Sequence, residues 1–349
     1  MKSVIQHQQG WTSEDVQDQS LWLHQLTDAE VADVRQALQA AKAAGMSCAT
    51  LTKASFPLRV VPALLAQVRD QLEHRLGFYV LRGLPVEGYA KDDLRLMYWG
   101  LGLHMGVAVS QSKNGDLLGD VKDFSVEVDK AVNRGYRTRR SLSFHTDTAD
   151  VVALFVLATA KAGGLSKIAS SLAVHDEIAR RRPDLLKILY EPFNWSWMGQ
   201  EAPGEAPDYP QPVFSVHEGY FSSRFIPPHI RAAAQRPGNP PLTAQQLEAT
   251  ALIEEVASDP RFHFEMMFQP GDVQFLNNHV TYHSRTEFED YPELERRRHL
   301  LRMWLSVENS RPLSPLMGAI YRDQSPGAIR GGFPSRVGGH IFETVVTTD

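Results

Sequence analysis

The feature that most constrains this chain is a set of metal-ligating residue types split between two distant segments. His145 and Asp147 lie in the segment Ser141–Thr148, and His283 follows an apolar, strand-like run much later in the chain. On an extended strand, residues i and i+2 point to the same side, so the spacing of His145 and Asp147 suits a strand end. A fold that uses all three residues together must bring His283 back to that strand.

Two imidazoles and one carboxylate are the ligand set that non-haem iron(II) uses, because three protein ligands on one face leave three positions open for substrates. His145 and Asp147 alone are a weak signal, since a buried histidine beside a solvated aspartate is a more frequent explanation of such a triplet. Zinc competes with iron for the same three side chains. Other motifs must therefore decide between these interpretations.

Three further motifs follow in the order that a known family requires. They are Gly163-Gly164-Leu165-Ser166, the run Pro270–Asn278 that leads into Val280–Thr286, and the run Arg298–Leu305. With the histidines and the aspartate, they make the chain resemble the taurine dioxygenase (TauD/TfdA-like) family of iron(II)- and 2-oxoglutarate-dependent oxygenases. The resemblance extends from about Phe78 to about Leu313.

This resemblance implies a role for each motif. His145, Asp147 and His283 would bind Fe(II), which would take 2-oxoglutarate and O2 at its open positions. Ser166 occupies the position of a hydroxyl that contacts the distal carboxylate of 2-oxoglutarate, although the family often has threonine there. Arg298 would pair with that carboxylate, as a guanidinium matches a carboxylate in shape and charge.

The choice of arginine depends on the alignment, because the segment Glu287–Glu295 is longer than in the founding member of the family. We favour Arg298, since Arg298 and Arg302 are spaced to point to one side of a strand. Arg302 falls on a second basic position, used in the family near the substrate or the co-substrate. Arg296 and Arg297 are interpreted as solvated partners of nearby glutamates.

Composition agrees with a single enzyme that acts on a small molecule. The chain has 349 residues, 43% of them hydrophobic, which is enough for a large core. A net charge of −5 argues against a nucleic-acid partner. The single cysteine, Cys48, fits a reducing compartment. We expect a cytoplasmic protein without a membrane segment, because the longest apolar run, Val151–Ala160, is too short to span a bilayer. A homo-oligomer is left open.

Residues 1–60 are predicted to form a helical extension packed on the core, and residues 61–349 a single TauD/TfdA-like oxygenase domain. Thr27 to Glu30 form a capping box that begins one helix, and Gly45 follows its end. A second helix is predicted from Pro62 to about Arg75. Later helices are predicted at the following ranges: His175–Arg182, Asp184–Tyr190 and Ala244–Ser258.

From Phe262 onwards the pattern changes to short β runs separated by turn residues. Strands are predicted near Val273, Val280 and from Leu300 to Val307. Together with the strand that begins at Phe78, these runs fit an α+β protein with a closed antiparallel barrel. The family's version of that barrel is a double-stranded β-helix, or jelly-roll, with flanking helices and the metal at its mouth.

Four residues are candidates for substrate contact: Arg302, Arg134, Arg137 and Gln111. The arginines upstream of His145 could form a lid that meets an anionic substrate, or a solvated basic loop. Gln111 could line the cavity or cap a turn. We predict a substrate with at least one anionic group, because a buried guanidinium without a partner is costly.

Other polar and aromatic residues receive structural interpretations. We expect an amide of Asn277 or Asn278 to satisfy backbone groups. His279 precedes His283 by a helical metal-pair spacing, but its β-branched and aromatic neighbours favour a strand or loop. The indole rings of Trp195, Trp197 and Trp304 are expected to serve packing.

Three classes of function remain open from the sequence. The first is a 2-oxoglutarate-dependent dioxygenase that hydroxylates an unactivated C–H bond of a small polar, carboxylate-bearing or amino-acid-like metabolite, with desaturation or ring closure as alternative outcomes. The second is a non-oxidative metal-dependent barrel enzyme, such as an isomerase or a hydrolase. The third is a non-catalytic sensor on the same barrel.

Overall fold

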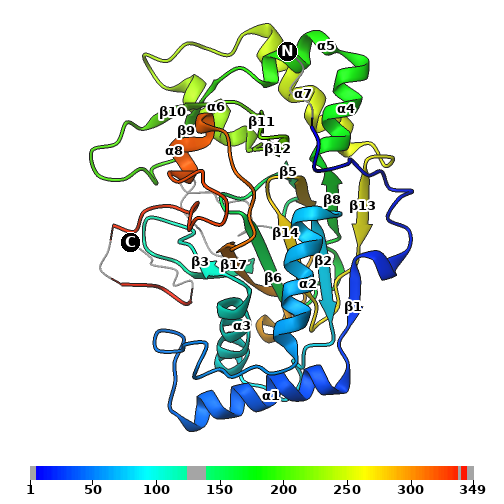
Figure 1. The fold of residues 1–349 in the computed structure, drawn as a ribbon, viewed down its shortest axis with the longest axis vertical. Helices are drawn as coiled ribbons and strands as arrows, with labels where there is room; N and C mark the ends of the chain where they lie inside the picture. Colours follow the sequence, from blue (N-terminus) through cyan, green and yellow to red (C-terminus); the bar gives the residue numbers. More distant parts are fainter. Residues whose placement is uncertain (1–4, 124–138, 337–338, 344–349) are drawn as a thin grey trace.

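The computed structural model describes residues 5–123, 139–336 and 339–343, and these residues combine helices with sheets whose strands are mostly antiparallel (Figure 1). The main sheet has seven strands, in the order β1-β2-β14-β6-β17-β3, with β4 also paired to β17. Its strands are β1 (Leu23–Gln25), β2 (Phe78–Arg82), β3 (Val107–Ala108), β4 (Leu118–Lys122), β6 (Val151–Ala158), β14 (Val273–Asn277) and β17 (His299–Ser306).

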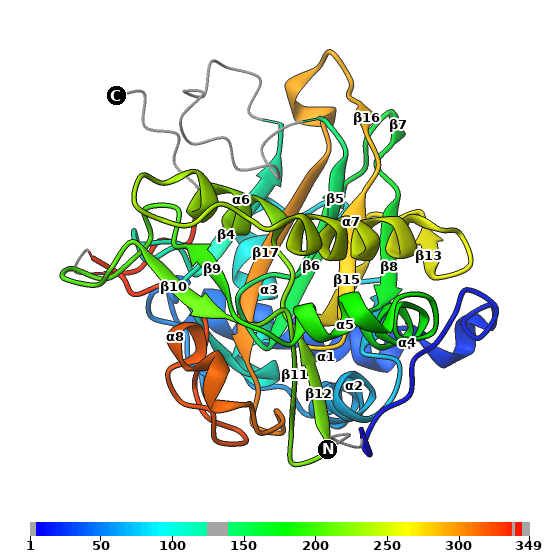
Figure 2. The same ribbon diagram turned by 90° about the horizontal axis from the view of Figure 1, so that it is seen from above.

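A second sheet of four antiparallel strands lies beside the main sheet (Figure 2). Its order is β13 (His263–Met266), β8 (Ser166–Ser170), β15 (Thr281–Arg285) and β5 (Leu142–His145). In the pairing of β15 with β5, His283 lies directly opposite His145. The register shifts between His283 and Arg285, so that Arg285 pairs with Leu142. Strand pairing therefore places the two histidines side by side.

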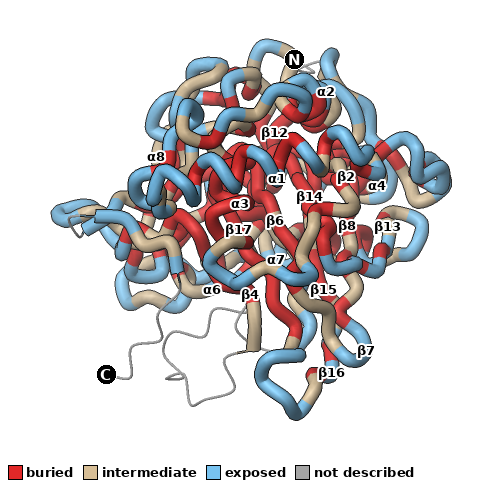
Figure 3. The backbone as a smooth tube through the Cα atoms, turned by 90° about the horizontal axis from the view of Figure 1, so that it is seen from below, coloured by how far each residue is buried: buried red, intermediate tan, exposed pale blue. Residues whose placement is uncertain are grey.

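Alternate residues of the central strands enter two different apolar cores. In β6, Ala153 and Phe155 belong to the core under the first three helices, whereas Val152 and Val156 belong to the core between the sheets. This alternation is the period of two of a strand with both faces covered. Strands β6, β14 and β17 are accordingly buried along almost their whole length (Figure 3).

Helices cover both sheets. Helices α2 (Val61–His74) and α3 (Lys91–Met105) contact the main sheet, and α1 (Asp28–Ala43) packs on both of them. Helices α4 (Ser171–Arg181), α5 (Pro183–Leu189) and α7 (Ala244–Ser258) pack together beside the second sheet, whose strands α4 and α7 contact. The remaining helices and strands are β7 (Ala162–Gly163), β9 (Phe193–Ser196), β10 (Asp208–Gln211), β11 (Phe214–His217), β12 (Tyr220–Ser223), α6 (Pro227–Gln235), β16 (Phe288–Glu289), α8 (Gly318–Tyr321) and the 3-10 turns Gln19–Leu21, Leu294–Arg296 and Pro315–Met317.

The predicted helices are confirmed, with boundaries that differ by at most one residue except at the start of α4. Helix α1 begins at the predicted capping box of Thr27 and Glu30, and Gly45 follows its end with φ of 64°. Helix α4 begins at Ser171, earlier than the predicted His175, because the Ser170 hydroxyl accepts a hydrogen bond from the Ala173 amide and so caps the helix there.

The N-terminal residues are tied to the main sheet. Strand β1 pairs in parallel with β2, and the Trp11 indole donates a hydrogen bond to the Leu76 carbonyl at 2.8 Å. Among the described residues, no helix is both long enough and apolar enough to cross a membrane.

Candidate active site

Strands β5 and β15 bring the predicted metal ligands together. His145 ends β5, Asp147 follows it, and His283 lies in β15. One candidate ligand atom from each of the three side chains lies within 4.8 Å of the others, and the centres of the two imidazole rings are 4.2 Å apart. One divalent ion could therefore contact all three side chains.

The electrostatics of these side chains suit metal binding. Burial and the neighbouring His145 lower the pKa of His283 to about 3, so its imidazole is neutral near pH 7. His145 Nδ1 lies 2.9 Å from the Ser143 carbonyl, which can only accept, so Nδ1 is the donor there and Nε2 is the nitrogen left to face a metal. His283 Nδ1 is buried and has no hydrogen-bond partner among the described residues. This donor set fits a borderline cation such as Fe(II) or Zn(II).

Asp147 is held by three surrounding groups. Trp304 Nε1 donates a hydrogen bond to Asp147 Oδ2 at 2.8 Å, and Arg302 Nη1 lies 3.5 Å from the same oxygen. The Asp147 amide donates to the Asn278 side-chain oxygen at 2.8 Å. Burial alone would raise the pKa of Asp147, but Arg302, the two histidines and Trp304 together lower it. The carboxylate is therefore ionised and fixed in orientation.

Trp304 packs in the core as predicted, but packing is not its only role. Its ring packs against Phe333, and its N–H also orients the carboxylate of a candidate ligand. The sequence held a signal for this role, because Trp304 is two residues from Arg302 and therefore lies on the same side of β17. The Asn278 side chain satisfies a backbone amide as predicted, and its target is the amide of Asp147.

The three side chains line a cavity of about 480 Å³, within the range typical of small-molecule sites. One part of its wall comes from strands and strand ends: Ser166, Gln274, Ser284, Arg285, Arg298 and Leu300. Another part comes from the loops between strands and from the first turn of α6: Thr148, Met198, Gln200, Pro227, His229 and Phe333. We call the first set the strand-built wall and the second set the loop-built wall.

Arg298 is the most isolated cation of the strand-built wall. It is 5% exposed, and its Nη1 has no hydrogen-bond partner among the described residues. Burial, followed by the nearby Arg285, lowers its pKa to about 9. The Ser166 hydroxyl lies 3.3 Å and 3.4 Å from the two amide atoms of Gln274, which are long hydrogen bonds. The Arg298 guanidinium and the Ser166 hydroxyl can each form a further hydrogen bond to a molecule in the cavity.

The neighbouring arginines are placed differently. Arg296 lies 3.6 Å from Glu293 at the surface, as predicted. Arg297 donates to the carbonyls of Tyr291 and Pro292. Arg298 and Arg302 both line the cavity, so the prediction that their side chains point to the same side is confirmed.

Arg285 is a cavity residue that the sequence analysis missed. Its guanidinium lies 4.6 Å from the centre of the Phe288 ring, which the Arg298 guanidinium also approaches, at 5.2 Å. Burial lowers the pKa of Arg285 to about 10. Its position two residues after His283, in a run read as a strand, was the available signal.

Gln111 lies in the cavity wall but is engaged with Arg302. Its Oε1 accepts a hydrogen bond from Arg302 Nε at 2.7 Å, and its Nε2 donates to the carbonyls of Leu117 and Arg302. Gln111 therefore fixes the direction of the Arg302 guanidinium, and its contact with a substrate stays a prediction. Arg134 and Arg137 lie outside the described residues.

Sequence comparisons identify the family to which the residues of this site belong. Residues 25–304 match the sequence profile of the family described as Taurine catabolism dioxygenase TauD, TfdA family. FR-33289 synthase of Streptomyces rubellomurinus is 33% identical over 318 residues, which cover 89% of this chain and 93% of that protein. Taurine hydroxylase-like protein SAT17 of Stachybotrys chartarum is 30% identical over 312 residues, which cover 86% of this chain and 79% of that protein.

Solved structures show the same fold. An asparagine oxygenase in complex with Fe(II), 2S,3S-3-hydroxyasparagine and succinate superposes with a TM-score of 0.63 at 19% identity, over 81% of this chain and 93% of that one. The non-haem iron oxygenase OrfP in complex with Fe and α-ketoglutaric acid superposes with a TM-score of 0.61 at 17% identity, with the same coverage.

Proposed function

This chain belongs to the taurine catabolism dioxygenase TauD, TfdA family, and from that premise we propose that it is an iron(II)- and 2-oxoglutarate-dependent dioxygenase. The proposed reaction is hydroxylation of an unactivated C–H bond in a small, carboxylate-bearing or amino-acid-like metabolite. One observation carries the proposal: His145, Asp147 and His283 share a cavity with the buried guanidinium of Arg298, whose Nη1 has no hydrogen-bond partner among the described residues.

In this proposal His145, Asp147 and His283 hold the iron, and Arg298 with Ser166 holds the distal carboxylate of 2-oxoglutarate. Iron and 2-oxoglutarate, when bound, would supply an oxidation that consumes O2 and releases succinate and CO2. A guanidinium and a hydroxyl are matched to a carboxylate in charge and hydrogen bonding. A non-oxidative metal enzyme gives Arg298 and Ser166 no such use.

The protein's own groups would orient the reactants and exclude water. Arg302 and Trp304 fix the Asp147 carboxylate from one side, so the ligand would not rotate during turnover. Apolar side chains of the cavity wall, among them Val152, Leu154 and Leu300, would keep water from the reacting carbon. Arg302 also lines the cavity, where we propose that it lies near the substrate or the co-substrate.

An anionic substrate is supported by the charge of the cavity wall. Its guanidinium groups come from Arg231, Arg285, Arg298 and Arg302, against one described carboxylate, that of Asp147. Iron would add positive charge, and 2-oxoglutarate would add two negative charges. A carboxylate-bearing substrate would reduce the remaining positive charge. The matched asparagine oxygenase structure holds 3-hydroxyasparagine, and a second OrfP structure holds (3S)-hydroxy-L-Arg, which supports an amino-acid-like molecule.

We also propose that the two sheets form the double-stranded β-helix of the family, with the candidate site at its mouth. Support comes from the shared core between the sheets and from the superposition on oxygenases. Residues 1–60 would be an extension on the catalytic unit 61–349, anchored through strand β1.

The experiment is anaerobic loading with Fe(II) and 2-oxoglutarate, followed by exposure to O2 and quantification of succinate. A panel of amino acids, their decarboxylated amines and their neutral amides is added separately. We expect succinate to rise most with molecules that carry a free carboxylate, together with products heavier by one oxygen atom. Products lighter by two hydrogen atoms would instead indicate desaturation or ring closure. Metal-dependent conversion without O2 consumption would reject the oxygenase proposal.

A further inference from the structure

The segment Ser310–Phe333 follows β17 and lies beyond the residues that match the family profile, which end at 304. It returns to the loop that carries Asp147. The Gly332 amide donates to the Thr148 carbonyl at 2.6 Å, and the Phe333 amide donates to the Ser110 carbonyl at 2.8 Å. The Phe333 side chain then forms part of the loop-built wall.

Two glycines allow this close backbone approach. Gly331 and Gly332 have φ of 82° and 70°, a region that residues with a Cβ rarely adopt. A Cβ on Gly331 would lie 3.0 Å from the Thr148 carbonyl oxygen, and a Cβ on Gly332 would lie 2.7 Å from that of Ser110. The segment is therefore shaped to lie directly on the metal-site loop.

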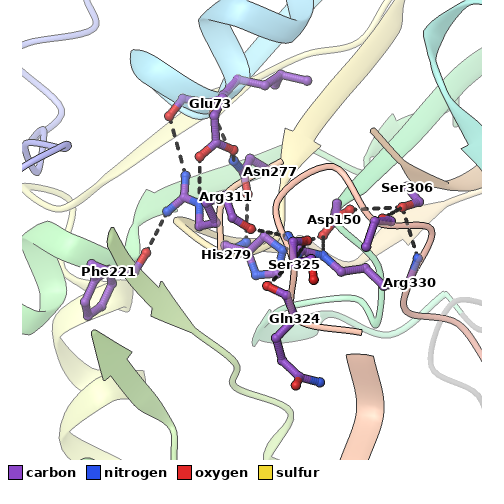
Figure 4. A network of polar contacts seen from close by, with 12 residues as sticks. Glu73, Asp150, Phe221, Asn277, His279, Ser306, Arg311, Gln324, Ser325 and Arg330 are labelled. Carbon is purple, nitrogen blue, oxygen red and sulfur yellow. Dashed lines mark hydrogen bonds and ion pairs between the residues drawn. The ribbon is translucent and has the colours of Figure 1, made fainter. Parts of the chain in front are cut away.

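Arg330 fixes the segment through a buried polar network (Figure 4). Its Nε donates to Asp150 Oδ1 at 2.8 Å, and its Nη2 donates to the Arg311 carbonyl at 2.7 Å. The Arg330 amide donates to the Ser306 hydroxyl at 3.1 Å. His279 Nε2 shares the same Asp150 oxygen at 2.8 Å. Arg330 is therefore bound to strand β17, to the loop after Asp147 and to its own segment.

The network reaches a candidate metal ligand in two steps. The Asp150 carbonyl accepts a hydrogen bond from the Asn278 amide at 2.9 Å, and the Asn278 side chain accepts one from the Asp147 amide at 2.8 Å. The same loop, residues 147–150, thus carries Asp147 at one end and binds Arg330 at the other.

Phe333 lies far from the proposed 2-oxoglutarate anchor. Its ring centre is 5.9 Å from that of Trp304 and 6.4 Å from that of Trp197. Trp304 lies within β17 and Arg298 directly precedes that strand, so six positions of largely extended chain, at most roughly 20 Å, separate them. Phe333 is therefore at the end of the cavity where a substrate, rather than the distal carboxylate of 2-oxoglutarate, would bind.

We propose that Phe333 is a specificity-determining residue that limits the length of the substrate, and that Arg330 is the residue that positions it. This inference rests on the proposed function for the identity of the ligands. The docking of the segment by Arg330 can be measured without any turnover.

The test uses the full chain loaded with Mn(II) and 2-oxoglutarate under nitrogen. Binding of L-amino acids graded by side-chain length is followed by tryptophan fluorescence in the wild type and in the variants Phe333→Ala, Phe333→Leu and Arg330→Gln. We expect Phe333→Ala to weaken binding of the best short ligand roughly tenfold and to improve binding of longer ones. Phe333→Leu should give an intermediate ranking. The half-saturating 2-oxoglutarate concentration should not change.

Arg330→Gln should shift the ranking in the same direction as Phe333→Ala. Hydrogen exchange should show faster exchange of the Gly332 and Phe333 amides in Arg330→Gln. Arg322→Gln is the matched control, since Arg322 lies in the same segment but pairs with Glu205 at the surface. An unchanged ranking in Phe333→Ala, or a changed 2-oxoglutarate requirement instead, overturns the role of Phe333. Unchanged amide exchange in Arg330→Gln overturns the role of Arg330.

The proposed function fails separately, if the wild type forms no succinate with any member of the panel. The fluorescence and exchange measurements keep their meaning in that case, because neither depends on turnover.

Discussion

The two walls of the cavity are built in different ways. The strand-built wall takes its side chains from β8, β14, β15 and the start of β17, where the period of a strand decides which side chain faces the cavity. The loop-built wall comes from segments between strands and from the segment Ser310–Phe333. Positive-φ glycines let that last segment approach the Asp147 loop, and the buried Arg330–Asp150 pair holds it there. The first can be anticipated from local spacing, whereas the second depends on contacts between distant residues.

This difference also separates two tasks. In our proposal the strand-built wall binds the co-substrate, which is common to the reaction, and the loop-built wall binds the substrate. Substitutions on the two walls should therefore give different phenotypes. The predictions below test that separation, beginning with the group that both walls share.

The largest effect is expected for Asp147→Ala, which removes the only carboxylate of the candidate trio. Turnover should be lost and iron affinity should fall by more than the roughly 10- to 100-fold typical of groups outside the ligand set. Iron titration with succinate quantification measures both. Asp123→Ala, outside the trio, is the control. If Asp147→Ala kept the wild-type iron affinity, Asp147 would not be a metal ligand, and the assignment of the two walls around one metal site would be wrong.

The next effect concerns the strand-built wall. Arg298→Ala should weaken 2-oxoglutarate binding by about 2–5 kcal/mol, because a buried carboxylate would lose its charged partner. The ranking of substrates should stay as in the wild type. Titration of 2-oxoglutarate against succinate formation measures the change.

Arg296→Ala is the matched control, since Arg296 lies at the surface beside Glu293. A normal 2-oxoglutarate requirement in Arg298→Ala with a raised requirement in Arg297→Ala would move the anchor by one residue and contradict the cavity geometry.

The third effect concerns the network behind the loop-built wall and appears in stability. Burial, opposed by the bond to Asp150, lowers the pKa of His279 from 6.5 to about 4. Between these values the unfolded chain binds a proton that the folded protein does not, so the free energy of unfolding should fall as pH drops from 6.5 to 4. His279 should account for about 3 kcal/mol of this loss, complete below pH 4, and His283, whose pKa burial lowers to about 3, adds to the wild-type loss in the same range.

Urea unfolding of the metal-free protein at several pH values measures this loss, and His279→Gln should show a flatter profile. The charged groups that face His279 are Asp150, Arg330 and Arg311, and the pKa of Asp150 is itself lowered below 3.8, outside this range. Parallel profiles for the two proteins would show that His279 is not the titrating group.

The smallest effect is expected for Trp304, which contacts Asp147 through its N–H and Phe333 of the loop-built wall through its ring. Trp304→Phe keeps the ring but removes the hydrogen bond to Asp147, so metal affinity should fall by about 10- to 100-fold. Trp197→Phe is the control, because its ring packs on Tyr209. Equal metal affinities in the two variants would show that the indole N–H does not orient the ligand.

The sequence predicted those parts of the molecule that local chemistry decides. Two local patterns are present in the structure as predicted. They are the capping box of Thr27 and Glu30 and the shared side of Arg298 and Arg302. The spacing of His145 and Asp147 indicated a strand end, and His283 returns beside it. The roles of these residues in binding iron and 2-oxoglutarate stay predictions.

The rest could not be predicted because it depends on which distant residues meet. Arg330 and Asp150 are ordinary charged residues in the sequence, and only folding makes them a buried pair. Trp304 packs as predicted, but its hydrogen bond to Asp147 joins residues 157 positions apart in the sequence. Phe333 carried no motif, and its place in the cavity follows from two glycines that let the backbone approach the loop.

The direct pairing of His145 with His283 has an evolutionary consequence. The position of both imidazoles is set by strand register, and a slip of one residue would turn a histidine to the other face. The length of the chain between them does not enter that geometry, and the entropic cost of lengthening a loop grows slowly. Insertions between β5 and β15 can therefore accumulate and diverge while the two histidines stay in place, so that new substrate preferences can arise without rebuilding the metal site.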